Sequence, residues 1–235
     1  MTARRLFLRA ATAIATINFG LVGPAHAEGE PRKTDVSRGA VIAAQGTATG
    51  APACALCHAF NGGSDGSGAF PRIATQPASY LAQQLRAFAS GVRANAVMSP
   101  VAKALSPGDI ADVTAYYASV KAPYLPLPKP APALNKRGEQ LAKVGSAAKQ
   151  LQACDNCHGP GGAGEPPAIP YLAGQYAQYI SFELQMWRRG YRKTSQEVMS
   201  AIAGKLDDQD IAALGAYYQQ VLAPDQTPPL QQDMR

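Results

Sequence analysis

The amino-acid sequence predicts an all-helical protein made of two similar domains joined by a proline-rich linker. Apolar residues recur at helical spacing near the end of each half, and strand-like alternation is absent. Residues of the first half return in the same order in the second half. Five prolines fall between the halves. We therefore expect a leader at 1–27, a first domain at 28–121, a linker at 122–133 and a second domain at 134–235.

The N-terminal segment 1–27 has the three parts of a secretory signal peptide. Arg4-Arg5 supplies the charged start, residues 10–22 are apolar, and Ala25-His26-Ala27 is a small-residue cleavage site. A membrane anchor is the alternative, but the apolar stretch is short and Asn18 interrupts it. The segment predicts export to the bacterial periplasm, with Sec and twin-arginine routes both open. The mature protein is expected to be soluble there or peripherally associated with the membrane.

The first half is expected to contain helices at about 36–44 and 78–90 and a further helix after Ser106. Ser106 is a candidate N-cap, Pro107 takes the first helical position, and Asp109 follows much as in a capping box. One face of this last helix then carries apolar residues at 3.6-residue spacing, namely Ile110, Val113, Tyr117 and Val120.

The second half repeats this pattern, with helices expected at about 136–144 and 177–189 and another after Asp207. Asp210 lies three residues beyond that cap, and Ile211, Leu214, Tyr218 and Val221 form the apolar face. Other pairs keep the same register: Arg38-Gly39 with Arg137-Gly138, Tyr80 with Tyr179, Gly91 with Gly190, and Tyr116-Tyr117 with Tyr217-Tyr218. The prolines between the halves favour an extended segment, either a spacer or a packed connection.

All four cysteines lie in two copies of one pentapeptide motif. Cys54-Ala55-Leu56-Cys57-His58 returns as Cys154-Asp155-Asn156-Cys157-His158. C-x-x-C-H is the attachment signature of c-type haem: each thiol forms a thioether with one vinyl group, and the histidine binds the iron. The sequence therefore predicts two covalently bound haem c groups, with His58 and His158 as proximal iron ligands.

Two other uses of paired cysteines explain the motif less well. A four-cysteine zinc site would leave both histidines without a role, and its cysteine pairs usually lie closer in sequence. A redox-active C-x-x-C would sit near a βαβ pattern, and the sequence has none. Two disulfides would be the default for four cysteines in an oxidising compartment, but the C-x-x-C-H context overrides it.

The numbers of histidines and methionines limit which residues could bind each haem iron at its sixth position. The chain has three histidines, and His26 leaves with the leader, so no histidine remains for a distal site. Met98 and Met199 stand 40 and 41 residues after His58 and His158. A lone methionine would be read as core filler, but a pair that recurs in a duplication favours axial ligation. Met186 is expected to be packing.

His/Met coordination raises the reduction potential and keeps the iron six-coordinate. A closed sixth position predicts an electron carrier and not an enzyme. Residues expected to pack against the haems are Pro71, Ile73, Tyr80 and Tyr117 in the first half and Pro170, Leu172, Tyr179 and Tyr218 in the second.

The net charge does not indicate a nucleic-acid partner. The formal charge of +6 includes Arg4, Arg5 and Arg9 of the leader, and without them 19 basic residues face 16 acidic ones. The haem propionates bring the total near −1, and no basic RNA- or DNA-binding motif is present. The basic run 188–193 is either a solvated helix end or a docking patch for an acidic redox partner.

On these motifs the sequence resembles the two-haem c4 cytochromes, a family with two tandem class I cytochrome c domains. The resemblance implies two domains packed about a pseudo-twofold axis, with haem propionates facing each other. It also implies a periplasmic electron-transfer protein of a respiratory chain. Its expected redox partners are a terminal oxidase, an upstream dehydrogenase or a bc1-type complex. One departure is His58-Ala59, where the second half has the more usual His158-Gly159.

Two other functions remain open. The closer one is the electron-accepting cytochrome subunit of a periplasmic dehydrogenase complex, which would share every motif. The other is an enzyme, either a dihaem peroxidase or a thiosulfate-oxidising cytochrome. The histidine and cysteine counts argue against an enzyme, since it would need an open site or unusual ligands.

Overall fold

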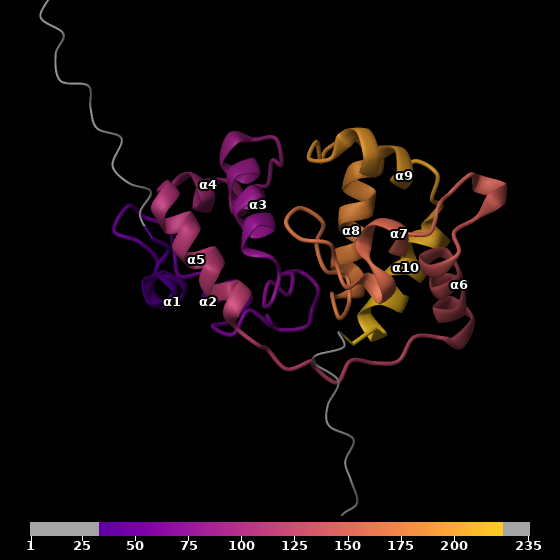
Figure 1. Ribbon diagram of the computed structural model, residues 1–235, viewed down its shortest axis with the longest axis horizontal. Coiled ribbons are helices and arrows are strands. Elements are labelled where there is room, and N and C mark those ends of the chain that lie inside the picture. Colours follow the sequence, from indigo (N-terminus) through magenta and orange to yellow (C-terminus); the bar gives the residue numbers. More distant parts are fainter. Residues whose placement is uncertain (1–32, 223–235) are drawn as a thin grey trace, which may run out of the picture. The chain divides into compact units, whose positions relative to one another are not determined.

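A computed structural model describes residues 33–222. The predicted leader, with His26, lies outside the described residues. The described residues, 33–222, belong to one compact unit. Within 33–222 the regular elements are helices, and only isolated β-bridges occur beside them (Figure 1). The prediction of an all-helical protein is confirmed.

The two halves carry the same series of helices. In the first half these are α1 (Val36–Gln45), α2 (Ala55–His58), α3 (Ala78–Ser90), α4 (Met98–Lys103) and α5 (Pro107–Ser119). In the second half they are α6 (Pro132–Lys143), α7 (Asp155–His158), α8 (Ala177–Arg188), α9 (Ala201–Ala203) and α10 (Asp208–Gln220). Short turns η1 (Ala147–Lys149), η2 (Pro160–Gly162) and the π-helical η3 (Gln196–Ser200) complete the second half.

The last helix of each half begins at the residue that the capping pattern predicts. Ser106 accepts a hydrogen bond from the Asp109 backbone, and the Asp109 side chain accepts one from the Ser106 backbone. Asp207 and Asp210 form the same capping box in front of α10. Each box satisfies backbone donors that a helix N-terminus leaves free.

Helix packing is also repeated between the halves. The first long helix packs on the last one, α1 on α5 and α6 on α10, and the middle helix α3 or α8 packs on the same last helix. Gly39 and Gly138 lie at the first crossing. A Cβ at either would approach a backbone carbonyl oxygen of the last helix to 2.1 Å. Only glycine allows this close approach, which explains the Arg-Gly pair that recurs before each C-x-x-C-H motif.

The arginine of each pair fixes the same crossing by charge. Arg38 forms ion pairs with Asp109 and Asp112 of α5. Arg137 forms one with Asp210 of α10, at 2.5 Å. A buried carboxylate needs such a partner, because an unpaired buried charge is costly.

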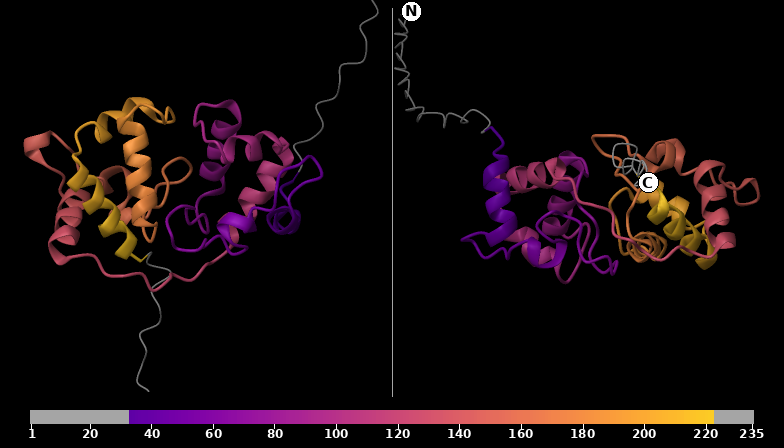
Figure 2. Two further views of the ribbon diagram at one scale, coloured as in Figure 1. Left: turned by 180° about the vertical axis from the view of Figure 1, so that it is seen from behind. Right: turned by 90° about the horizontal axis from the view of Figure 1, so that it is seen from below.

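The segment between the halves is packed against the protein and is not a free spacer. Arg72 donates to the carbonyl of Pro123 at 3.0 Å and to that of Ala122, and its guanidinium lies 4.4 Å from the Tyr124 ring centroid. The extended part ends at Ala131, because α6 already starts at Pro132. Both views in Figure 2 show this segment running between the two groups of helices.

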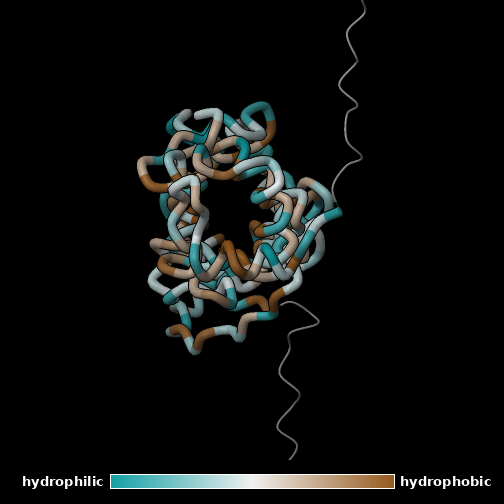
Figure 3. Tube along the Cα trace, turned by 90° about the vertical axis from the view of Figure 1, so that its left-hand side faces the viewer, coloured by the Kyte–Doolittle hydropathy of each residue, from teal (hydrophilic) through white to brown (hydrophobic). Residues whose placement is uncertain are grey.

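Each half has its own apolar core. The first is built around Ile42, Ile110 and Tyr117, and the second around Leu141, Ile211 and Tyr218. Hydrophobic and hydrophilic stretches are interspersed along the trace of residues 33–222 (Figure 3). Among the helices within 33–222, none has both the length and the hydrophobicity to cross a membrane.

Candidate functional site

Each C-x-x-C-H motif forms a single helical turn. The backbone N–H of His58 donates to the carbonyl of Cys54 at 2.9 Å, and that of His158 donates to the carbonyl of Cys154 at 2.9 Å. This turn brings both cysteines and the histidine of one motif to one side of the chain. All four cysteines are free and half-buried. In the described part of the chain, no three His, Cys, Asp or Glu side chains are arranged as a metal site.

Both motif histidines are oriented by a backbone carbonyl. The Nδ1 atom of His58 lies 3.1 Å from the carbonyl oxygen of Pro71, and that of His158 lies 3.1 Å from the oxygen of Pro170. A carbonyl can only accept, so Nδ1 carries the proton and Nε2 keeps its lone pair for iron. Burial lowers the pKa of both imidazoles, and the carbonyl acceptor opposes this only in part. Both rings are therefore neutral at pH 7, the form that binds a metal.

The first cysteine of each motif, Cys54 or Cys154, has its thiol largely removed from water. Burial raises the pKa of Cys54, and burial together with the nearby Asp155 raises the pKa of Cys154 to about 11. A thiol with a raised pKa stays protonated and reacts slowly with oxidants.

The residue after each histidine has the same unusual backbone conformation. Ala59 adopts φ 58° and ψ 158°, and Gly159 adopts φ 73° and ψ 160°. The departure His58-Ala59 therefore leaves the path of the chain unchanged. The cost falls on Ala59, since this region of backbone space is almost restricted to glycine.

Both motifs open onto one cavity of 740 Å³. Its wall is largely apolar and includes the four cysteines, His58, His158, Met98 and Met199. It also includes the residues predicted to pack against the haems: Pro71, Ile73, Tyr80, Tyr117, Pro170, Leu172, Tyr179 and Tyr218. Met186 is not among the lining residues. A largely apolar cavity whose wall holds two thiols, one imidazole and one thioether from each half fits a thioether-linked haem in each half.

The two methionines are held in short helical turns, Met98 at the start of α4 and Met199 in η3. Asn95 uses its side-chain oxygen to accept from the backbone N–H groups of Val97 and Met98, at 2.9 and 2.8 Å. This cap starts α4 at Met98 despite Pro100, because a proline in the first turn costs no hydrogen bond. Met199 lies in η3, the π-helical turn before α9.

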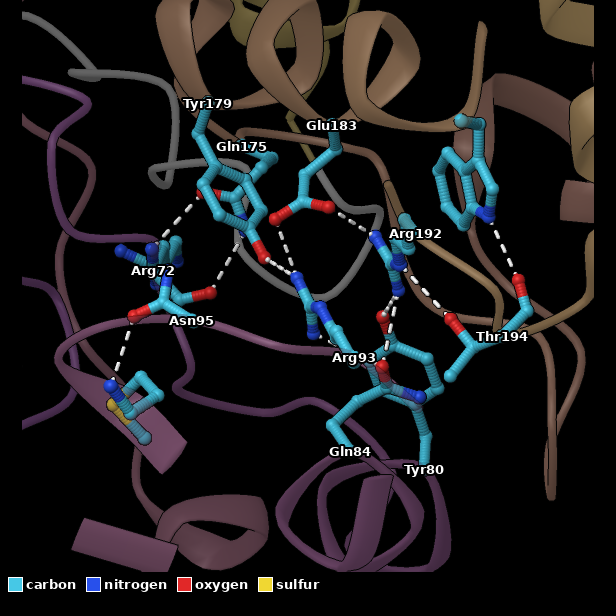
Figure 4. Close-up of polar contacts among 12 residues, drawn as sticks. Arg72, Tyr80, Gln84, Arg93, Asn95, Gln175, Tyr179, Glu183, Arg192 and Thr194 are labelled. Atoms are coloured by element: carbon cyan, nitrogen blue, oxygen red, sulfur yellow. Dashed lines mark hydrogen bonds and ion pairs between the residues drawn. The ribbon is translucent and has the colours of Figure 1, made fainter. Parts of the chain in front are cut away.

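A polar network joins the two halves beside this cavity, and sequence reasoning missed it. Arg93 pairs with Glu183 at 2.5 Å and donates to Tyr179 and Gln84. Arg192 pairs with the other oxygen of Glu183 at 2.6 Å and donates to Gln84 at 3.0 Å. Figure 4 shows the two guanidinium groups on either side of the Glu183 carboxylate. Arg93 and Arg192 also form an antiparallel bridge through their backbones.

The repeat register contained a signal for these residues. Arg93 and Arg192 each stand two residues after Gly91 and Gly190, and Gln84 corresponds to Glu183. The environment of Arg192 changes the interpretation of the basic run 188–193. Arg192 is buried and paired, so the run is neither wholly a solvated helix end nor wholly an exposed docking patch.

Comparisons with known proteins find cytochrome models in both halves. Residues 37–121 match the model described as cytochrome c. Residues 140–217 match the model described as cytochrome c oxidase, cbb3-type, subunit III. The two matches cover the two haem motifs separately, which confirms two tandem cytochrome c domains.

Similar proteins are known over most of the chain. It is 38% identical to a thiosulfate dehydrogenase electron acceptor of Thiomonas intermedia, over 71% of this chain and 77% of the relative. It is 35% identical to cytochrome c4 of Pseudomonas aeruginosa, over 86% of this chain and 94% of the relative. Among solved structures, thiosulfate dehydrogenase (TsdBA) from Marichromatium purpuratum superposes with a TM-score of 0.73 at 40% identity. That alignment covers 79% of this chain but 40% of the larger one.

Proposed function

The chain belongs to the dihaem cytochrome c4 family, and on that premise we propose which residues hold its two covalent haem c groups. Cys54 and Cys57 form the thioethers of the first half, and Cys154 and Cys157 those of the second. His58 and His158 are the proximal ligands. The protein is an electron carrier and not an enzyme, as are the relatives named cytochrome c4 and electron acceptor.

We assign the sixth iron positions to Met98 and Met199. Both methionines line the same cavity as the histidines, and they occupy equivalent places in the repeat. A thioether ligand favours ferrous iron relative to a second imidazole and raises the potential. A filled sixth position also keeps peroxide and oxygen from the iron.

The chain's own residues favour electron transfer because they keep the iron ligands and the cavity wall in fixed positions. When bound, each haem supplies an iron that alternates between the ferrous and ferric states. The Pro71 and Pro170 carbonyls fix the two imidazole rings in one tautomer and orientation. The Asn95 cap fixes the start of α4 at Met98. The apolar cavity wall limits solvent rearrangement when the charge changes.

The observation that carries this proposal is the repetition of one complete ligand set in both halves. We expect Met98→Ala and Met199→Ala each to remove one haem's share of the weak far-red sulfur-to-iron absorption of the ferric protein. Met186→Ala is the matched control, because Met186 lies outside the cavity lining, and it should keep the full band. A full band in either axial variant would disprove that assignment.

We place this carrier in a periplasmic respiratory chain, between an upstream dehydrogenase or bc1-type complex and a terminal oxidase. The segment 1–27 supports export as a signal peptide. Sequencing the N-terminus of the purified holoprotein tests this, and we expect it to begin near Glu28. A mature chain that retains Arg4-Arg5 would contradict it. A salt wash of the membrane fraction would separate peripheral association from free solution.

A second role is that of electron acceptor for a thiosulfate dehydrogenase, favoured by the similarity to an acceptor with that name. Stopped-flow mixing of the ferric protein with such an enzyme and thiosulfate would measure it. Reduction of both haems on the enzyme's turnover time supports this partner. Reduction no faster than in enzyme-free controls assigns the chain to another donor.

A further inference from the structure

Each half of the protein inserts one buried glutamine onto the backbone of the other half. Gln175 accepts from the backbone N–H of Arg72 at 2.9 Å and donates to the carbonyl of Arg72 at 2.8 Å. Gln76 accepts from the N–H of Tyr171 at 3.1 Å and donates to its carbonyl at 2.8 Å. The two glutamines are 6% and 7% exposed. They stand at equivalent positions, five residues after Pro170 and Pro71.

These contacts meet the peptide groups that orient the proximal histidines. The Pro71–Arg72 peptide accepts from His58 through its carbonyl and donates to Gln175 through its N–H. The Pro170–Tyr171 peptide accepts from His158 and donates to Gln76 in the same way. One planar peptide group therefore lies between each histidine and a side chain of the opposite half. Figure 4 shows Gln175 reaching towards Arg72.

Hydrogen bonds on the two ends of one peptide group strengthen each other. An acceptor on the N–H draws electron density towards the carbonyl oxygen, which then binds the imidazole N–H more strongly. A stronger bond at Nδ1 gives the imidazole more anionic character and makes it a better donor to ferric iron. The potential of that haem falls as a result.

We propose that Gln175 tunes the reduction potential of the haem bound by His58, and that Gln76 tunes that of the haem bound by His158. Each glutamine acts across the boundary between the halves, as a positioning residue for a histidine that it does not touch. The inference rests on the proposed proximal ligands. It gives each domain control over the electron affinity of the other through a single peptide group, although both glutamines also line the cavity.

Glutamine suits this role because its side-chain amide carries an N–H donor and a C=O acceptor, as a backbone peptide group does. It can donate and accept in one plane and so pair with both polar groups of a single residue. An apolar residue of similar size could fill the space but would leave a buried N–H without its acceptor. A role in packing alone would not require the same paired geometry at both positions.

The test is a reductive titration of the holoprotein followed by nuclear magnetic resonance. Ferric haem methyl signals are assigned to the first half by contacts with Phe88 and to the second by contacts with Trp187, since both side chains line the cavity. The titration gives the reduction potential of each haem, and the difference between the two potentials sets the partition of an electron between the haems. We expect Gln175→Leu to shift it about two- to tenfold towards the first haem, from the 10–30% cooperativity of peptide hydrogen bonds. Each tenfold step corresponds to 59 mV for one electron.

The reciprocal variant is the main control. Gln76→Leu should shift the partition by a similar factor towards the second haem. Ser79→Ala removes another contact between the halves, the 2.6 Å bond to the Pro167 carbonyl, without touching either peptide, and should change neither potential. A loosened interface would move both haems together in every variant. Shifts of both haems, or none, in the two glutamine variants would overturn the proposal.

A second variant covers the case in which leucine prevents folding. Gln175→Met keeps an unbranched side chain of similar length but removes the amide that accepts from the Arg72 N–H, so it should raise the potential of the first haem more than that of the second. An equal rise in both haems, or no change in either, would contradict the proposal. If the unmutated holoprotein shows no signals of iron-bound His58 and His158, the ligand assignment itself is wrong. This outcome differs from a failure of the glutamine proposal alone.

Discussion

At the residue scale, the two halves use different residues, Ala59 and Gly159, for the same backbone turn. The chain must turn sharply after each haem-binding histidine, and Gly159 does so without strain. Ala59 takes the same conformation at φ 58° and ψ 158°. For a residue with a Cβ, this region costs about 1–3 kcal/mol. The first half therefore carries strain next to His58 that the second half lacks.

We expect Ala59→Gly to stabilise the holoprotein by about 1 kcal/mol, because the relief of strain exceeds the added entropy of an unfolded glycine. Urea unfolding followed by circular dichroism measures this. Gly159→Ala is the mirror control and should cost about 1–3 kcal/mol. Its new Cβ would lie 3.0 Å from the Gly164 carbonyl oxygen, so a tight contact adds to the cost of the backbone conformation. Equal stability of all three proteins would contradict this explanation.

At the element scale, the segments that follow α3 and α8 carry the polar contact between the halves. Arg93 and Arg192 bridge there, and each guanidinium also lies over an aromatic ring of its own half, 4.5 Å from Phe88 and 3.8 Å from Trp187. Glu183 of α8 faces both guanidinium groups and is 8% exposed. Its equivalent in α3 is the neutral Gln84. One carboxylate therefore serves two buried arginines.

The Glu183 carboxylate makes stability depend on pH. Burial alone would raise its pKa, but Arg192 and Arg93 outweigh burial, and the pKa is lowered. The folded state therefore binds fewer protons than the unfolded state at acidic pH. The stabilisation is complete above the unfolded pKa of about 4.3 and is lost as pH falls through the lowered folded value.

Glu183→Gln should cost about 3–5 kcal/mol at pH 7, because it leaves two buried arginines without a counter-charge. The melting-temperature difference from the parent holoprotein should shrink as pH falls below about 4. Gln84→Ala at the equivalent position of α3 is the matched control, and its effect should not vary over this pH range. A Glu183→Gln difference that stays constant from pH 7 to pH 3 would refute the charge account.

At the scale of the whole molecule, most of the fold follows from local patterns that the sequence repeats. The α5 and α10 starts could be predicted because capping uses residues three positions apart. The C-x-x-C-H motifs could be predicted because one helical turn contains the whole attachment site. The candidate axial methionines required a count of the remaining histidines together with the repeat.

The contacts between the halves could not be predicted in the same way. Gln76 and Gln175 bond to backbone groups about a hundred residues away, and no local pattern marks a backbone partner. Arg192 looked like part of a basic surface run, yet it is buried against Glu183. The early start of α6 at Pro132 was hidden by prolines that also suit a linker, although proline fits a first helical turn. Tertiary context decided each of these cases.

The central claim is that this chain holds two closed His/Met haem sites that exchange single electrons. A redox titration of the purified protein, followed spectroscopically with and without hydrogen peroxide, tests it most directly. We predict two one-electron waves, a far-red sulfur-to-iron band that disappears in two steps as the haems are reduced, and no catalytic consumption of peroxide. A ferric protein without that band, or steady peroxide turnover, would contradict the claim.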